Sequence, residues 1–527
     1  MSSVIKQTIK GHVYLYESIS YRDEHGRPRS KRVLIGKADP VTGKPIYKAE
    51  YIDRMRAEGK PIEEESEVKK YSETDVKHSR VKELGASYLY RAIAERTGLL
   101  DVLQDTIPEY WEQVYTIACF LVSCNEPVMY CADWAEKTDG LPTASVSPSS
   151  ISRLFKEITV SDRNRFFEGW GMMCQENEYL ALDITSISTY SELIEEAEWG
   201  YNRDKEKLPQ INLCLLLGEK TRLPVFQTVY SGSLKDVSTL KTTLETAAAL
   251  SFSNLMAVMD KGFYSATNVN ALMSAKTGLR FLLAASFSSS FTKTQVENAR
   301  NCIDLAKNTI TVGDDSVLGV VMQPQWGGSR KIYAHVFYNV VQAAISKQNL
   351  YAEVASLAEI AKSNPDNSDH KKAFKKYLSI DKPANGNCAI GIRQDVVETE
   401  LAYSGWLVIL SNHIKSAAEA IRIYRAKDVV EKGFYRLKNN LELGRLRVHS
   451  NEAMLNKVFV GFIALIIMSY IHNVMLDNGL YYKMTMKKLI SVLEKIRVHY
   501  IRKDRIIVPL TKEQTEILNA FKLPLTL

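Results

Sequence analysis

Four residues of one segment, Tyr424, Lys427, Glu431 and Lys438, are spaced so that a single helix would carry them on one stripe. At about 100° per residue, their side chains would project within about one quarter of the helix circumference. A lone carboxylate among cations on such a stripe is suited to holding a metal ion while its neighbours contact phosphate groups. The spacing therefore predicts a metal site for a phosphate-bearing substrate.

Two aspartates upstream are further candidate ligands. Asp183 ends the apolar run LALD and Asp260 ends the run LMAVMD, and both runs are typical of buried strands. Carboxylates without His or Cys form a hard oxygen-donor set suited to two Mg²⁺ ions, for which Mn²⁺ can substitute. Taken singly, an Asp after a strand often caps a turn, and a Glu on a basic helix often pairs with a cation. Only the three carboxylates together therefore indicate catalysis.

A mixed α/β layer would position the two aspartates. The predicted strands are 179–188, 211–217, 223–230, 255–260 and 280–285, and the predicted helices are 236–250 and 265–276. Ligands of open α/β sheets gather at the carboxyl ends of strands, where both aspartates would lie. The mixed pattern of residues 290–400 predicts an inserted subdomain, after which YSGWLVILSN resumes the layer.

Composition and periodicity divide the remaining chain. Residues 12–36 predict a hairpin whose tip carries basic side chains at positions 27, 29, 31 and 32, and Ser147-Pro148 predicts the start of a helix. The predicted segments are a basic hairpin region at 1–57, a linker at 58–80, a helical and possibly DNA-binding domain at 81–175, the first part of the α/β core at 176–289, the insertion at 290–400, the second part of the core at 401–476, and a basic helical region at 477–527.

Composition limits the class of protein. The 527 residues are 45% hydrophobic and carry a formal charge of +7, with basic clusters at 422–449 and 483–505 that suit a polyanion, although such clusters are also common on solvated helix faces. None of the seven cysteines forms a CxxC pair, which argues against a zinc site or a disulfide framework. The N-terminus has no signal-like apolar region, and the run Val458–Met468 is shorter than the roughly 18 residues of a membrane span. A cytoplasmic protein is expected.

The joint pattern resembles the signature of bacterial insertion-sequence transposases of the DDE type. It is closest to the subgroup defined by tyrosine, two residues, arginine, three residues, glutamate, six residues and lysine, with Lys427 in the place of the arginine. Lysine keeps the charge but not the two-point fork, so a simple phosphate contact is the part of that role that it can retain. The phrase SGSLKDVSTL and the basic hairpin also resemble this family.

The resemblance implies a ribonuclease H-like catalytic core, interrupted by the insertion, that cuts transposon ends and joins them to new DNA. Asp183 would bridge two metal ions, and Asp260 and Glu431 would each complete one. By the same resemblance, Tyr424 would contact DNA phosphates. The other expected DNA contacts are Lys427, Lys438, Arg436, Arg445 and Arg447. Expected partners are double-stranded DNA, namely the terminal inverted repeats and the target, and a second copy of the chain in the synaptic complex. Trp326 could stack on an extruded base.

Three other readings stay open at this point. A metal-dependent nuclease would share all three acids and never join DNA. A DNA-binding relic would keep the basic surfaces without a working metal site. Acid and base chemistry on a sugar would use two of the carboxylates, but three acids set among cations suit a polyanion better than a neutral glycan.

Overall fold

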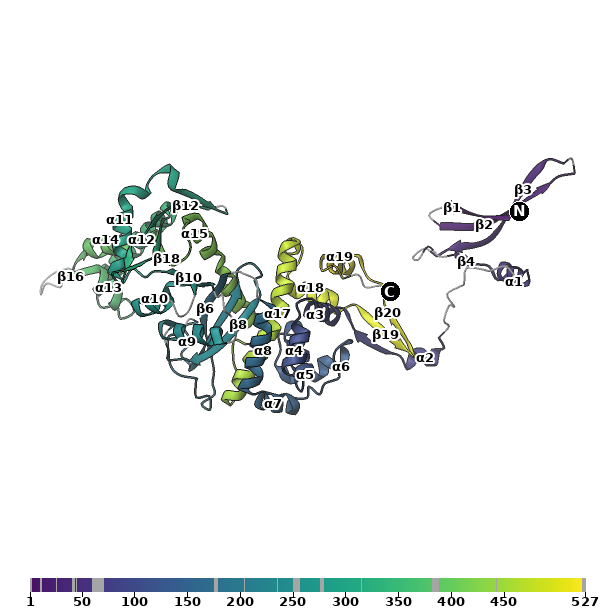
Figure 1. Ribbon diagram of the computed structural model, residues 1–527, viewed down its shortest axis with the longest axis horizontal. Coiled ribbons are helices and arrows are strands. Elements are labelled where there is room, and N and C mark those ends of the chain that lie inside the picture. The colour runs from purple at the N-terminus through teal and green to yellow at the C-terminus, as the bar shows by residue number, and fades with distance from the viewer. Residues whose placement is uncertain are drawn as a thin grey trace. The chain divides into compact units, whose positions relative to one another are not determined.

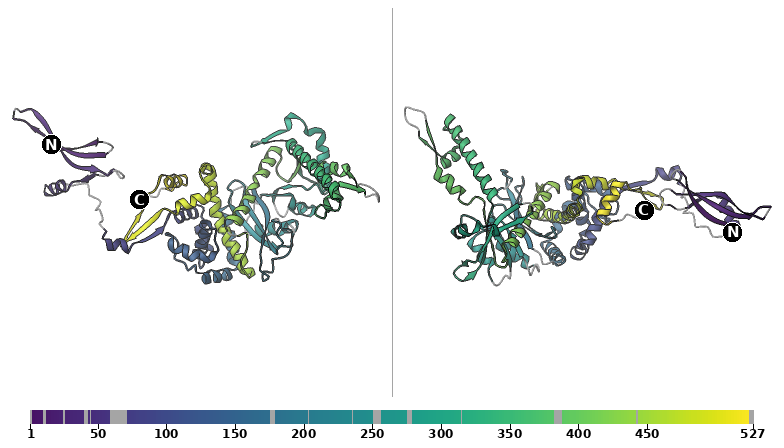
Figure 2. Two further views of the ribbon diagram at one scale, coloured as in Figure 1. Left: turned by 180° about the vertical axis from the view of Figure 1, so that it is seen from behind. Right: turned by 90° about the horizontal axis from the view of Figure 1, so that it is seen from above.

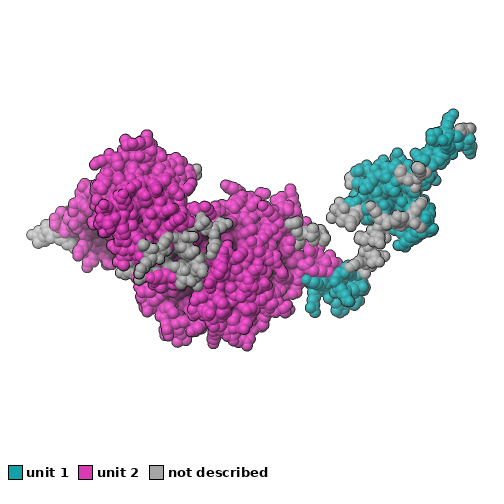
Figure 3. Space-filling view, in the orientation of Figure 1, with its two compact units in different colours: residues 1–80, 500–504 teal, residues 81–499, 505–527 magenta. Residues whose placement is uncertain are grey.

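The structure is a computed structural model that describes residues 2–9, 12–24, 26–39, 43, 45–58, 71–174, 179–202, 204–234, 236–249, 256–274, 279–313, 315–381, 388–441 and 443–523. Contacts divide the chain into two compact units, shown in teal and magenta in Figure 3. The first comprises Met1–Arg80 with Tyr500–Asp504, and the second comprises Val81–His499 with Arg505–Leu527. All three candidate carboxylates lie in the second unit.

The first unit is built on a four-stranded antiparallel sheet in the order β1-β2-β3-β4. Its elements are β1 (Ser2–Ile9), β2 (His12–Arg22), β3 (Pro28–Ala38), β4 (Pro45–Tyr47), α1 (Ala49–Ala57) and α2 (Glu73–Lys77). The predicted hairpin is confirmed, because β2 pairs with β3 from Tyr14↔Lys37 to Arg22↔Pro28. Residues 59–70 of the predicted linker lie outside the described residues.

The second unit contains a nine-stranded sheet in the order β11-β12-β15-β18-β10-β9-β6-β7-β8 (Figure 1). The strands of its first half are β6 (Tyr179–Ser188), β7 (Gln210–Gly218), β8 (Pro224–Ser231), β9 (Met256–Met259) and β10 (Arg280–Ala284). β6, β7 and β8 are antiparallel neighbours, whereas β9 runs parallel to both β6 and β10. The five predicted strands are therefore confirmed. The two predicted helices are present as α9 (Asp236–Ala249) and α10 (Ala266–Leu272).

The insertion contributes to this same sheet. Its strands β11 (Thr309–Val312), β12 (Asp315–Met322) and β15 (Tyr333–Tyr338) extend the sheet beyond β18 (Trp406–Ser411). Only its later part has a hydrophobic core of its own, formed by Leu350, Val354, Leu357, Phe374 and Val397, among others. That part lies to one side of the sheet (Figure 2) and consists of α12 (Val340–Ser363), α13 (Lys371–Tyr377), β16 (Leu378–Asp381), β17 (Ala389–Ile392) and α14 (Gln394–Leu401).

Trp326 of the insertion is a core residue. Its side chain is 8% exposed, and its ring packs edge to face against Phe291 with the centroids 4.7 Å apart. Its indole Nε1 donates a hydrogen bond to Asn270 Oδ1 at 3.0 Å. Because the ring is buried, packed against Phe291 and hydrogen-bonded to Asn270, it has no free face on which a base could stack. The stacking role predicted for Trp326 therefore does not fit this structure.

A helical layer packs against the β6–β8 side of the sheet. It comprises α3 (Gly85–Arg96), α4 (Leu99–Thr106), α5 (Trp111–Ser123), α6 (Cys131–Lys137), α7 (Pro148–Glu157), α8 (Val160–Met173), α17 (Asn451–Asp477) and α18 (Met486–Leu493). The helix start predicted at Ser147-Pro148 is confirmed, since the Ser147 side chain accepts a hydrogen bond from the Ser150 amide and Pro148 opens α7.

Helix α17 is the main buried helix of this layer. It continues beyond the predicted apolar run and packs against α5, α7 and β8. By length and hydropathy α17 could cross a membrane, but 78% of its most apolar window is buried inside the protein. Phe459 and Phe462 meet the rings of Phe166 and Phe167 there, so protein contacts account for its apolar sequence.

The segment that carries the predicted stripe is not one continuous helix. It consists of α15 (Ala417–Ala426), α16 (Asp428–Tyr435) and the π-helical turn η4 (Arg436–Asn440). At Lys427 the hydrogen bonds join residues three apart instead of four, because the Lys427 amide donates to the Tyr424 carbonyl and the Val430 amide donates to the Lys427 carbonyl. The wider η4 turn then changes the rotation per residue beyond Tyr435. The prediction of one uniform stripe is therefore wrong.

Candidate active site

Asp183 and Asp260 are brought together by the pairing of two parallel strands. In the β6–β9 register, Leu182 lies opposite Met259, so the next residues along the chain are Asp183 and Asp260. Adjacent strands are about 4.8 Å apart, and residues at equivalent positions share a face of the sheet. Asp183 is 5% exposed and Asp260 is partly buried at the end of β9. The sheet thus places the two carboxylates side by side. The predicted strand end is confirmed for Asp260 but is wrong for Asp183, which is the fifth residue of the ten-residue β6, because the strand continues through Ser188.

Both aspartates also have local structural partners. Asp183 Oδ1 accepts a hydrogen bond from the Ile184 amide at 2.8 Å. Asp260 Oδ1 accepts from the Lys261 amide at 2.7 Å and from the Tyr424 hydroxyl at 3.1 Å. Asp260 thereby caps the short helix η2 (Lys261–Phe263). The turn-capping role expected of an isolated Asp is present at Asp260, together with a bond to a residue 164 positions away.

Tyr424 links the three carboxylates. Burial is the largest influence on its hydroxyl and raises its pKa well above the ordinary value. The negative charges of Asp260, Glu431 and Asp183 raise the pKa of Tyr424 further. Of the three acids, Asp260 is the one that accepts a hydrogen bond from the Tyr424 hydroxyl, at 3.1 Å.

Glu431 reaches this group from α16, which packs against β6 and β7. Gly433 permits this close packing, because a Cβ atom there would lie 3.0 Å from Leu217 Cδ2. The Glu431 side chain is 61% exposed, and its Oε1 lies 3.3 Å from Lys427 Nζ. The side chain of Lys427 is only 8% exposed. Glu431 is therefore carried by a helix that packs on the strand of Asp183, and its carboxylate is paired with a buried lysine.

The carboxylates fit a divalent cation in donor type, since all three supply hard oxygen ligands. Within the described ranges, however, no group of three or more His, Cys, Asp and Glu is arranged so that it could hold a metal ion. One of the three carboxylates, Glu431, forms an ion pair with Lys427.

Lys438 and Arg445 form ion pairs with the segment that connects β6 to β7. Lys438 Nζ lies 2.6 Å from Asp204 Oδ2, and both terminal nitrogens of Arg445 lie 2.6 Å from the two oxygens of Glu206. The Arg445 guanidinium also lies over the Tyr190 ring, 5.1 Å from its centroid. The Arg445 hydrogen bond is the largest influence on Glu206 and lowers its pKa. Two cations predicted to hold DNA phosphates are thus paired with carboxylates.

Sequence reasoning did not identify Asp204 or Glu206. Their only local signal is an acidic and polar stretch after the first predicted strand, which is typical of a surface loop. Nothing along the chain connects that stretch to Lys438, which lies 234 positions away.

The prediction that Arg436 extends a DNA-contacting surface is wrong. Its side chain is buried at 5% exposure, because η4 packs against α17. Within the described part of the chain, its Nε and Nη2 atoms are buried without a hydrogen-bond partner. Burial lowers the pKa of Arg436 to about 10. A guanidinium enclosed in this way cannot lie against a duplex without a rearrangement of η4.

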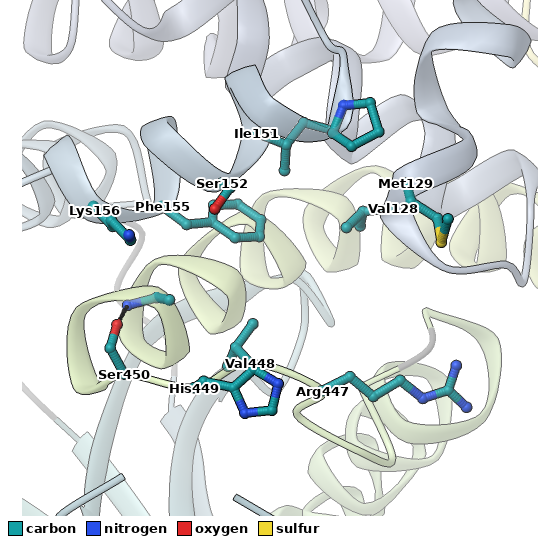
Figure 4. A pocket seen from close by; sticks show the side chains of 12 residues that line it. Val128, Met129, Ile151, Ser152, Phe155, Lys156, Arg447, Val448, His449 and Ser450 are labelled. Atoms are coloured by element: carbon teal, nitrogen blue, oxygen red, sulfur yellow. Dashed lines mark hydrogen bonds between the residues drawn. The ribbon is translucent and has the colours of Figure 1, made fainter. Parts of the chain in front are cut away.

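Arg447 lies on the rim of a separate cavity of about 440 Å³ (Figure 4). Its backbone is in the left-handed region, with φ of +49°. The apolar wall of the cavity includes Ile151 and Phe155 of α7, and Lys156 and His449 also line it. The structure therefore places Arg447 beside the helical layer, and its predicted contact with DNA stays a prediction.

Comparison with known proteins identifies a family. Residues 175–467 match the family model described as the transposase DDE domain. No curated protein sequence matches the chain. A cryo-EM structure of a piggyBac transposase synaptic complex with hairpin DNA is similar at 11% identity, over 79% of this chain and 74% of that chain. Its TM-score of 0.35 is too low to support an argument, so the family match alone bears on function.

Proposed function

Since the chain belongs to the family of DDE transposases and is a DNA transposase, we propose that Asp183, Asp260 and Glu431 form its catalytic centre. In this proposal the protein cuts the ends of a mobile DNA element and joins them to target DNA. The observation that carries the proposal is the placement of the two aspartates on neighbouring parallel strands, one of which packs against the helix of Glu431.

The three carboxylates would hold divalent cations, for which Mg²⁺ is the best match and Mn²⁺ an alternative. When bound, such ions activate an attacking oxygen and stabilise the leaving oxygen of a phosphodiester. The protein contributes position: the β6–β9 pairing fixes the two aspartates, and α16 brings Glu431 toward them. Glu431 would offer its Oε2 atom to the cation while Oε1 keeps its contact with Lys427.

The fold that we propose for the catalytic region is ribonuclease H-like. The mixed sheet around β6 and β9, the long insertion before β18 and the late helix that carries Glu431 support it. The spacing of Tyr424, Lys427, Glu431 and Lys438 supports membership of the bacterial insertion-sequence subgroup with the tyrosine, arginine, glutamate and lysine signature. The substrate would be the terminal inverted repeats, held by two copies of the chain in a synaptic complex.

The test uses the full chain and a duplex that carries the terminal inverted repeat found in the DNA flanking the gene. We expect Asp183→Asn, Asp260→Asn and Glu431→Gln each to abolish Mg²⁺-dependent cleavage while most of the DNA affinity is retained. Asp428→Asn is the matched control, because Asp428 lies on the same helix and pairs with the exposed Lys432. Cleavage near the wild-type rate by any of the three variants would remove that residue from the centre.

A second assay separates the proposal from its rivals. A duplex with a pre-cut 3′ end is offered together with a target plasmid, and joined products are counted. Joining supports a transposase that completes both steps, whereas cleavage without joining indicates a nuclease. If the wild-type chain neither cleaves nor joins in Mg²⁺ or Mn²⁺ but still binds the duplex, it is a DNA-binding relic, and the proposal fails.

A further inference from the structure

Tyr424 and Lys427 each contact a carboxylate of the protein. The family resemblance assigns both residues to backbone phosphates, yet in the structure each contacts one of the proposed catalytic carboxylates. We propose that Tyr424 and Lys427 are positioning residues, which orient Asp260 and Glu431 for the cation. This inference rests on the proposed function, because it assumes that these carboxylates are metal ligands.

Asp260 is held by two hydrogen bonds to one of its carboxylate oxygens. Its Oδ1 atom receives two donors, the Lys261 amide and the Tyr424 hydroxyl. No hydrogen bond to Oδ2 is present among the described residues. Two donors on one oxygen fix the rotation of the carboxylate, so the other oxygen is presented in a defined direction. Ligands of metal ions are commonly oriented by such outer partners, and loss of one typically costs about 10- to 100-fold in metal affinity or activity.

The Tyr424 side chain has little room to move. The ring packs in a core cluster with Ile421 and Ile423 of α15, which leaves little freedom for the hydroxyl to turn toward a bound duplex. A phosphate contact would require this hydrogen bond to Asp260 to break.

The Lys427 side chain is buried. An exposed lysine can follow a phosphate, but this side chain is 8% exposed and its Nζ lies against Glu431. The Lys438 side chain is similarly shielded at 13% exposure, but its partner Asp204 is not one of the proposed metal ligands. Lys427 also marks the point where the hydrogen bonding changes between α15 and α16, so it joins the helix of Tyr424 to the helix of Glu431.

The experiment removes one hydroxyl. Tyr424→Phe keeps the ring, and Tyr435→Phe is the matched control because Tyr435 is a 65% exposed tyrosine of α16. Two quantities are measured: Mn²⁺ binding by calorimetry without DNA, and the dissociation constant of the inverted-repeat duplex in EDTA. We expect Tyr424→Phe to weaken Mn²⁺ binding by about tenfold or more and to leave the dissociation constant of DNA within about twofold. The reverse pattern would overturn the proposal.

The lysines provide a second test in case the tyrosine variant is misfolded. Lys427→Met should raise the Mg²⁺ concentration required for half-maximal cleavage and weaken Mn²⁺ binding, with little change in DNA affinity. Lys438→Met should do the opposite, with a shallower dependence of DNA affinity on salt by about one unit of the log–log slope. If both variants lose DNA affinity and keep metal affinity, Lys427 is a phosphate contact after all.

These results are distinguishable from failure of the proposed function. If Asp183→Asn still cleaves and wild-type protein binds no Mn²⁺, the catalytic centre itself is misplaced. If Asp183→Asn is inactive and wild-type protein binds Mn²⁺, but Tyr424→Phe and Lys427→Met bind it equally well, only the positioning inference fails.

Discussion

The ion pairs of Lys438 with Asp204 and of Arg445 with Glu206 lead to a quantitative prediction about DNA affinity. If the two cations hold phosphates, DNA has to displace two carboxylates that already occupy them. Replacing both acids by their amides, in Asp204→Asn combined with Glu206→Gln, removes this competition without changing the size of the side chains. We therefore expect tighter binding of the inverted-repeat duplex.

The magnitude follows from the exposure of the pairs. The side chains are 13% and 50% exposed in the Lys438–Asp204 pair, and 26% and 33% exposed in the Arg445–Glu206 pair. Because water and salt screen such pairs, each contributes about 0.5–1 kcal/mol. Breaking both would cost about 1–2 kcal/mol, which corresponds to a decrease in the dissociation constant of roughly 5- to 30-fold in the double variant.

The assay is fluorescence anisotropy with a labelled duplex over a series of salt concentrations. Loss of two negative charges favours DNA binding by itself, so the control is Glu192→Gln combined with Glu195→Gln. These two exposed acids belong to the same connecting segment. We expect the slope of the logarithm of affinity against the logarithm of salt to stay constant while the affinity rises. Affinity no higher than in the control would refute the competition, and weaker binding would mean that the acids hold the cations ready for DNA.

The remaining predictions concern stability. Burial, and then the charge of Glu83, raise the pKa of Glu494 to about 7. The folded state thus binds this proton more tightly than the unfolded chain does, so stability falls as pH rises from about 4.5 toward 7. After allowance for partial exposure, Glu494→Gln should raise the free energy of unfolding by about 1–2 kcal/mol at pH 8 and by much less at pH 5. The measurement is urea unfolding at both pH values. Equal urea midpoints for the variant and the wild type at pH 8 would contradict this prediction. A Cβ atom at Gly200 would lie 1.9 Å from the Gly232 carbonyl oxygen. Gly200→Ala should therefore destabilise the protein by about 1–3 kcal/mol, and an unchanged melting temperature would show that the backbone there adjusts freely.

Much of the local structure could be predicted from the sequence. The runs that became β6 and β7 are apolar without alternation because both faces of each strand are covered, and such runs are distinctive. The hairpin of β2 and β3 and the cap of α7 at Ser147 follow from equally local chemistry, namely turn residues and a hydroxyl before a proline. The strand end at Asp260 was identified in the same way.

The insertion and Arg436 show where local patterns fail. β15 pairs with β18, and β12 and β11 follow it, because without the insertion β18 would leave the sheet with an unpaired edge. No composition signal tells a strand which edge it will meet. Arg436 looks like an exposed cation in a basic cluster, but the π-helical turn directs it inward against α17. Rotation per residue depends on hydrogen bonds that the sequence does not specify locally.

The sequence by itself determined which residues could do chemistry: two aspartates in predicted strands, a glutamate among cations, and a spacing that resembles a family signature. Only the tertiary structure decided the partner of each side chain. Tyr424 meets Asp260, Lys427 meets Glu431 and Lys438 meets Asp204. The physical reason is range, because helix and strand periodicity act over a few residues, whereas the bonds of Tyr424 to Asp260 and of Lys438 to Asp204 span 164 and 234 positions and exist only once the sheet and helices have packed.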